Sequence, residues 1–78
     1  LSFKENIEKS IFSFSNLKTL YFFPSGRWDI LTDKDILIKL PQEFIVGSLN
    51  LSKKLIDNEN FRDYKFIDLR VKNHLVVK

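Results

Sequence analysis

Few side chains in this 78-residue chain have the types and spacing that catalysis requires. His74 is the only histidine, and no nucleophile with an orienting partner is recognisable around it. Asp33 and Asp35 stand two residues apart in a polar stretch, where carboxylates usually cap the backbone of a turn and keep it soluble. The sequence therefore predicts that the chain is not an enzyme.

Metal and cofactor binding receive no better support. The chain has no Cys, and its His and carboxylates do not cluster at the spacing of metal ligands. Gly26 and Gly47 are the only glycines, so a glycine-rich phosphate loop is missing. We therefore expect no metal, no cofactor and no small-molecule substrate.

The formal net charge of +3 raises the question of nucleic acid. Lys far outnumbers Arg, and the Lys residues are scattered, whereas phosphate and base recognition favours arginine forks. Lys53 and Lys54 are expected on a solvated helix face. We therefore expect no nucleic-acid partner. The alternative function is a basic nucleic-acid-binding module, whose binding would weaken steeply with salt.

No apolar run in the sequence is long enough to cross a bilayer.

Hydrophobic periodicity predicts two helices. The first spans Ser2–Ser13 and opens with a capping box formed by Ser2 and Glu5. The second spans Glu43–Asp57, and Gly47 indicates either close packing or a later helix start. The apolar stripe of the first comprises Phe3, Ile7, Ile11 and Phe14, and that of the second comprises Ile45, Leu49, Ser52 and Ile56.

Alternating or β-branched runs predict strands at residues 17–23, 27–31, 36–40, 65–70 and 74–78, separated by turn signals such as Pro24-Ser25-Gly26. The chain is thus expected to form one α+β domain over residues 1–78, with the order α-β-β-β-α-β-β. An antiparallel-rich sheet of about five strands carries both helices on one face. Its expected core comprises Trp28, Ile30, Ile36, Ile38, Leu40, Ile67 and Leu69, together with the two helix stripes.

We expect the last predicted strand, residues 74–78, to leave its outer edge uncovered. An uncovered hydrophobic edge is a template for pairing with another chain, and it also allows edge-to-edge self-association. We expect Leu75 and Val77 on one face of this strand, and a proline at Val76 to disrupt the edge. The candidate partner-binding residues are Arg70, Val71, Lys72, Asn73, His74, Leu75, Val76, Val77 and Lys78.

Four short motifs occur in one order along the chain. They are Gly26-Arg27-Trp28-Asp29, Ile38-Lys39-Leu40-Pro41, Ile67-Asp68-Leu69-Arg70 and Leu75-Val76-Val77-Lys78. In this order the chain resembles the C-terminal β-domain of the bacterial cell-division family FtsQ, also called DivIB, over residues 16–78. Val71 and Lys78 depart from that pattern, because some relatives carry aromatics there.

The resemblance implies a divisome scaffolding module on the periplasmic side of the inner membrane at the division site. It implies a partial β-domain, with the family's POTRA domain and membrane anchor lying outside this chain. Its partners are then FtsB-like and FtsL-like division proteins, and the FtsB-like partner adds a strand at the C-terminal edge.

Overall fold

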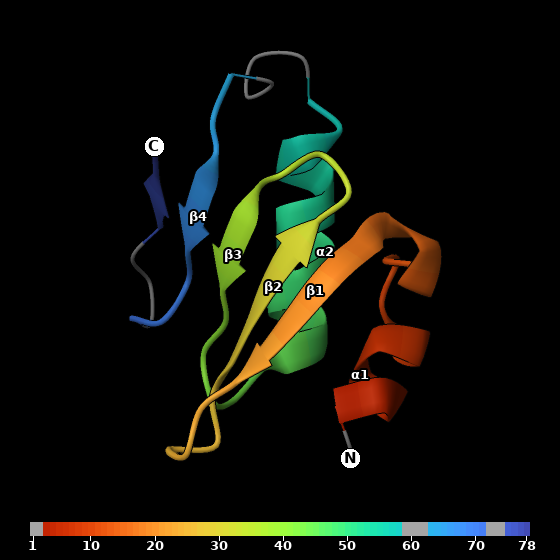
Figure 1. The fold of residues 1–78 in the computed structure, drawn as a ribbon, viewed down its shortest axis with the longest axis vertical. Coiled ribbons are helices and arrows are strands. Elements are labelled where there is room, and N and C mark those ends of the chain that lie inside the picture. Colours follow the sequence, from red (N-terminus) through yellow and green to blue (C-terminus); the bar gives the residue numbers. More distant parts are fainter. Residues whose placement is uncertain (1–2, 59–62, 72–74) are drawn as a thin grey trace.

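The computed structural model describes residues 3–58, 63–71 and 75–78. The elements in chain order are α1 (Phe3–Lys9), a 3-10 turn η1 (Phe14–Asn16), β1 (Leu17–Phe22), β2 (Trp28–Thr32), β3 (Leu37–Lys39), α2 (Ile45–Ile56), β4 (Phe66–Asp68) and β5 (Val76–Val77). This order confirms the predicted α+β class and the succession α-β-β-β-α-β-β (Figure 1).

The five strands form one sheet in the order β1-β2-β3-β4-β5. All neighbours are antiparallel except β3 and β4, which are parallel. A parallel pair needs a crossover connection, and α2 supplies it by lying between β3 and β4 in the chain. The sheet is therefore mixed but mostly antiparallel, and β1 and β5 are its two edges.

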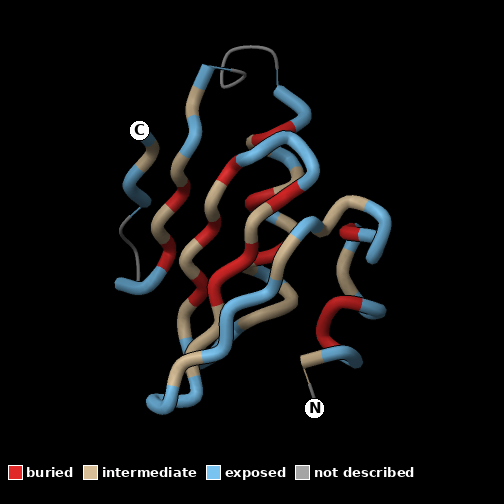
Figure 2. The backbone as a smooth tube through the Cα atoms, in the orientation of Figure 1, coloured by how far each residue is buried: buried red, intermediate tan, exposed pale blue. Residues whose placement is uncertain are grey.

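The core is a continuous row across the sheet under the helices. Cross-strand pairing joins Leu20 to Ile30, Ile30 to Ile38, Ile38 to Ile67, and Ile67 to Val77. The three central members of this row are buried, and burial falls off towards both edges (Figure 2). The predicted strand faces are thus confirmed, because Ile36, Ile38 and Leu40 are all buried. Trp28 is half-buried and stacks on Phe3 of α1, with the ring centroids 4.3 Å apart.

The first helix is shorter than the predicted Ser2–Ser13. The hydroxyl of Ser10 donates to the carbonyl of Ile7 at 2.7 Å and accepts from the N–H of Phe12 at 3.2 Å. Such side-chain bonds compete with helical ones and end the helix. The chain then buries Phe12 and leaves Ile11 and Phe14 exposed, so the predicted stripe is wrong beyond Ile7. Ser2 lies outside the described residues, as does the capping box expected there.

The other elements follow the prediction with shorter bounds. The second helix begins at Ile45 instead of Glu43, and its stripe buries Leu49, Ser52 and Ile56. Strand β4 covers only Phe66–Asp68, and strand β5 only Val76–Val77, where residues 65–70 and 74–78 were expected. Lys72, Asn73 and His74 lie outside the described residues.

Candidate partner-docking site

The backbone of β5 is hydrogen-bonded on one side only. Lys78 and Phe66 exchange two backbone hydrogen bonds of 3.0 Å each. Hydrogen-bonded and non-hydrogen-bonded pairs alternate along an antiparallel ladder, so the next pair, Val77 with Ile67, is of the second kind. Val77 therefore directs its N–H and C=O to the outer side of the sheet, and Val76, opposite Asp68, directs its own towards β4. Among the described strands none lies beyond β5.

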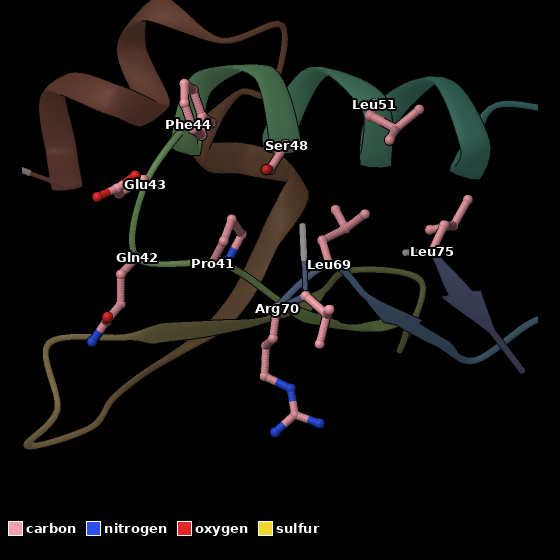
Figure 3. Close-up of a pocket in the computed structure, with 10 residues that line it drawn as sticks. Pro41, Gln42, Glu43, Phe44, Ser48, Leu51, Leu69, Arg70 and Leu75 are labelled. Atoms are coloured by element: carbon pink, nitrogen blue, oxygen red, sulfur yellow. The ribbon is translucent and has the colours of Figure 1, made fainter. Parts of the chain in front are cut away.

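The side chains of this edge alternate as the sequence predicted. Val77 lies with Leu55 and Ile56 of α2 around a small apolar hollow. Leu75 also lies on the α2 side, close to Leu51 (Figure 3). Val76 is paired with Asp68, whose side chain is on the opposite face of the sheet. A strand added at this edge would therefore find apolar surface on one face and charged groups on the other.

A groove of about 610 Å³ opens between the start of α2, with the residues just before it, and the residues that follow β4 and precede β5 in the chain. Its apolar lining comprises Phe44, Leu51, Leu69, Val71 and Leu75 (Figure 3). Of these, only Leu69 is buried, and the other four are exposed. Ligand-binding hollows combine such apolar walls with a few polar groups, which Glu43, Ser48 and Gln42 provide here.

Phe44 stands at the rim of the groove in an uncommon backbone conformation. It is the N-cap residue of α2, has a φ of 57°, and makes no side-chain capping bond. The left-handed region costs an L-residue roughly 1–2 kcal/mol, which is why Gly or Asn usually occupies it. The ring is nevertheless 71% exposed. A strained, exposed aromatic at a groove is a reason to infer a binding role.

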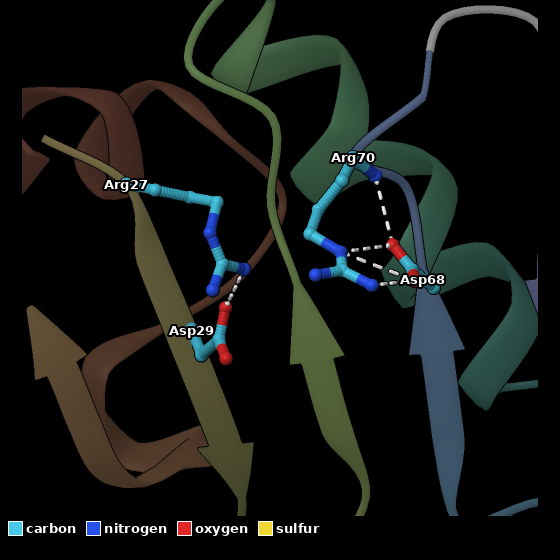
Figure 4. A network of polar contacts seen from close by, with 4 residues as sticks. All are labelled: Arg27, Asp29, Asp68 and Arg70. Carbon is cyan, nitrogen blue, oxygen red and sulfur yellow. Dashed lines mark hydrogen bonds and ion pairs between the residues drawn. The ribbon is translucent and has the colours of Figure 1, made fainter. Parts of the chain in front are cut away.

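Arg70 leads from the groove to the charged face of the sheet. Its side chain points away from α2 and forms a two-pronged ion pair with Asp68, with Nη2 at 2.7 Å from Oδ2 (Figures 3 and 4). A second pair, Arg27 with Asp29 at 2.5 Å, lies two strands away (Figure 4). Between them Lys39 is in register with both Asp29 and Asp68, so signs alternate across the sheet.

These contacts keep Arg70 and Asp68 charged. The hydrogen bonds from the Arg70 side chain lower the pKa of Asp68 below its ordinary 3.8, with a smaller contribution from the backbone N–H of Arg70. The same pair raises the pKa of Arg70. The bonds to Asp68 use Nε and Nη2 of the guanidinium. The geometry thus fixes a charge-paired arginine on the face of the sheet opposite α2, over the space between β3 and β4 (Figure 4).

The structure brings most of the predicted binding residues together. Arg70, Val71 and Leu75 line the groove, and Val76, Val77 and Lys78 form the edge beside it. Lys72, Asn73 and His74, which complete the predicted set, fall outside the described residues.

The sequence reasoning missed the α2 wall of the groove. The apolar Phe44, at the N-cap, and Leu51, within α2, are seven residues apart with the polar Ser48 between them, and they form a second line beside the buried stripe. A helix that already has a buried stripe and carries further apolar residues along another line has a second surface to cover. That pattern was the available signal.

Other kinds of site find little support in the described part of the chain. No group of three or more His, Cys, Asp or Glu that could hold a metal ion occurs there. None of the helices in it is long and apolar enough to span a membrane. Compared with protein-family models, with curated proteins and with solved structures, the chain matches none of them.

Proposed function

We propose that this chain is a protein-interaction module that binds an extended segment of a partner by strand addition at β5. The observation that carries the proposal is the outward-facing backbone of Val77, two residues after Leu75, which lines an apolar groove. Strand addition draws affinity from main-chain hydrogen bonds and specificity from alternate side chains, and this edge offers both. The partner's backbone bonds the N–H and C=O of Val77, and the partner residues on the α2 side enter the groove.

The partner's chemistry follows from the two faces of the edge. On the α2 side the groove suits a large apolar side chain, because Leu51, Leu69 and Leu75 surround it. On the other side Val76 is opposite Asp68, whose charge is balanced by Arg70, so this face suits a polar residue. A partner segment that alternates apolar and polar residues therefore fits best.

We further propose that the module serves divisome assembly, with FtsB-like and FtsL-like proteins as its partners. This part of the proposal rests on the resemblance to the FtsQ family. Each of the four motifs includes part of a strand: Trp28 and Asp29 begin β2, and Ile38 and Lys39 end β3. Ile67 and Asp68 end β4, and the last motif contains β5. The domain then acts on the periplasmic side of the inner membrane.

The alternative, a nucleic-acid-binding module, gains little from the charge distribution. Several basic side chains are already ion-paired within the chain, namely Lys4, Lys18, Arg27, Lys53 and Arg70. These pairs are spread over α1, α2 and the sheet, whereas nucleic-acid binding needs cations gathered on one face.

Two substitutions of one residue test strand addition. Val77→Pro removes the outward N–H without removing a hydrogen bond to β4, and Val77→Ala keeps the N–H while losing at least as much side-chain packing. The ligand is a peptide from the periplasmic part of an FtsB-like protein, titrated by calorimetry after circular dichroism shows each variant folded. Val77→Pro is expected to bind about tenfold or more weakly than Val77→Ala, since each tenfold corresponds to about 1.4 kcal/mol.

Equal affinities of folded Val77→Pro and Val77→Ala would rule out strand addition at this edge. If the wild-type chain does not bind the peptide but binds duplex or single-stranded oligonucleotides at physiological salt, the basic module is the correct function.

A further inference from the structure

The opposite edge of the sheet, β1, carries the most exposed run of large apolar residues in the described chain. Leu20, Tyr21 and Phe22 follow one another and are 39%, 44% and 60% exposed. Edge strands are normally protected by charges, prolines or bulges, because a flat apolar edge pairs with other chains. No charged residue interrupts this run.

The free hydrogen-bonding groups of β1 are fixed by its pairing with β2. The N–H of Phe23 donates to the carbonyl of Arg27 at 3.0 Å, so this pair is hydrogen-bonded. Counting back along the ladder, Tyr21 with Asp29 is hydrogen-bonded, and the pairs of Phe22 and Leu20 are not. Leu20 and Phe22 therefore direct their N–H and C=O groups to the outer side of the sheet.

The usable length of this edge has two definite ends. At one end the register shifts around Lys18, and a bulge of this kind interrupts regular pairing. At the other end Pro24 has no N–H and begins the turn. Between them lies Thr19–Phe23, whose central residue is Tyr21 and whose outward groups are placed symmetrically about it. Lys18, the one lysine of β1, is drawn into an ion pair with Asp35.

We propose that two copies of this chain pair through β1, antiparallel, with a two-fold axis at Tyr21. In this register Leu20 of each copy is opposite Phe22 of the other, and their outward groups form four backbone hydrogen bonds. Lys18 is opposite Pro24 of the second copy, so no like charges meet. This proposal is independent of the proposed function, which uses β5.

Strand β1 of one copy pairs better with β1 of the second copy than with β5 of the second copy. Strand β5 has only Val76 and Val77 in regular pairing, so β1 would find few partners there. Pairing of β1 with β5 is also heterologous and does not close, whereas pairing of β1 with itself closes as a dimer.

Disulfide trapping tests this register, because the chain has no Cys of its own. In the proposed dimer the two Tyr21 residues form a non-hydrogen-bonded pair with Cα atoms about 4.5 Å apart, within the range of a disulfide. Tyr21→Cys is expected to convert to covalent dimer under mild oxidation. Ser25→Cys, an exposed control on the same hairpin, is separated by roughly 26 Å from its symmetry mate at about 3.3 Å per residue, and it should stay monomeric.

Sedimentation equilibrium supplies the matching test without cysteine. Leu20→Lys should raise the dimer dissociation constant by roughly tenfold or more, because both apolar cross-strand pairs are lost. The proposal would be overturned if Tyr21→Cys and Ser25→Cys were trapped equally, or if neither were trapped. It would also be overturned if the wild-type chain remained monomeric at high concentration. A Tyr21→Cys disulfide that forms only when mixed with Val76→Cys would overturn it as well, since that is pairing of β1 with β5.

Discussion

The two edges of this sheet differ in what they offer to another chain. Edge β1 is six residues long and exposes the apolar run Leu20–Phe22, and its outward groups on Leu20 and Phe22 are symmetric about Tyr21. Edge β5 has two residues in regular pairing, but it has an apolar groove near one face and the Asp68–Arg70 ion pair on the other. A symmetric edge suits a second copy of the same chain, and an asymmetric edge with a groove suits a different partner.

The comparison depends on which backbone groups face outward at β5, and proline substitutions measure this. Val76→Pro removes a group that faces β4, so it should lower the free energy of unfolding by about 1–3 kcal/mol, as expected when a hydrogen bond is broken and its partner left unpaired. Val77→Pro should lower it by less than Val76→Pro. Urea denaturation of both variants gives the two values. A larger loss for Val77→Pro would mean that the assigned phase of the ladder is reversed.

Substitutions of Phe44 test whether the groove contributes to peptide binding at the β5 edge and not to dimer formation at the β1 edge. Phe44→Gly removes the left-handed strain at the N-cap of α2 and should raise the free energy of unfolding by about 1 kcal/mol. It also removes the exposed ring from the groove rim, so binding of the FtsB-like peptide should weaken while trapping through Tyr21→Cys is unchanged. Phe44→Leu, which keeps an apolar side chain, is the control. Stabilisation without any loss of peptide binding would contradict a binding role for Phe44.

The smallest expected effect is the pH dependence contributed by Asp68. Because Arg70 lowers the pKa of Asp68 in the folded chain, the pair stabilises the fold above the ordinary pKa of 3.8, and this contribution is lost as the pH falls through the lowered value. Asp68→Asn should therefore destabilise by about 0.2–1 kcal/mol at pH 7, as partly exposed pairs do. The difference from wild type should shrink below about pH 4, as thermal unfolding across pH would record. A difference that grows towards acid pH would have the wrong sign.

The parts of the fold that follow a local period could be predicted from the sequence. Ile36, Ile38 and Leu40 repeat every second residue, and the side-chain faces of β3 follow directly. The end of α1 could not be predicted in the same way, because the hydroxyl of Ser10 outcompetes helical bonds and turns Phe12 inward.

Only one part of the candidate site, the C-terminal strand, could be predicted from the sequence. The apolar C-terminal strand is visible in sequence, but the groove joins Phe44 and Leu51 to Leu69 and Leu75, which only the crossover from β3 to β4 brings together. The hydrogen-bonding phase of β5 is also invisible in sequence, since side-chain alternation leaves it open whether Val76 or Val77 faces outward. The sequence predicted that a proline at Val76 would disrupt the edge, but the outward N–H belongs to Val77, so the proline that tests strand addition is at Val77.

Amide hydrogen exchange at Val76 and Val77 is the most direct test of strand addition at β5. In the free chain the Val76 amide should exchange slowly, because it donates to β4, and the Val77 amide should exchange fast. Saturation with the FtsB-like peptide should slow exchange at Val77 at least about tenfold, corresponding to about 1.4 kcal/mol of added protection. The exchange rates of the Leu20 and Phe22 amides should not change. A Val77 amide that is protected in the free chain, or unaffected when the peptide is bound, would contradict the account.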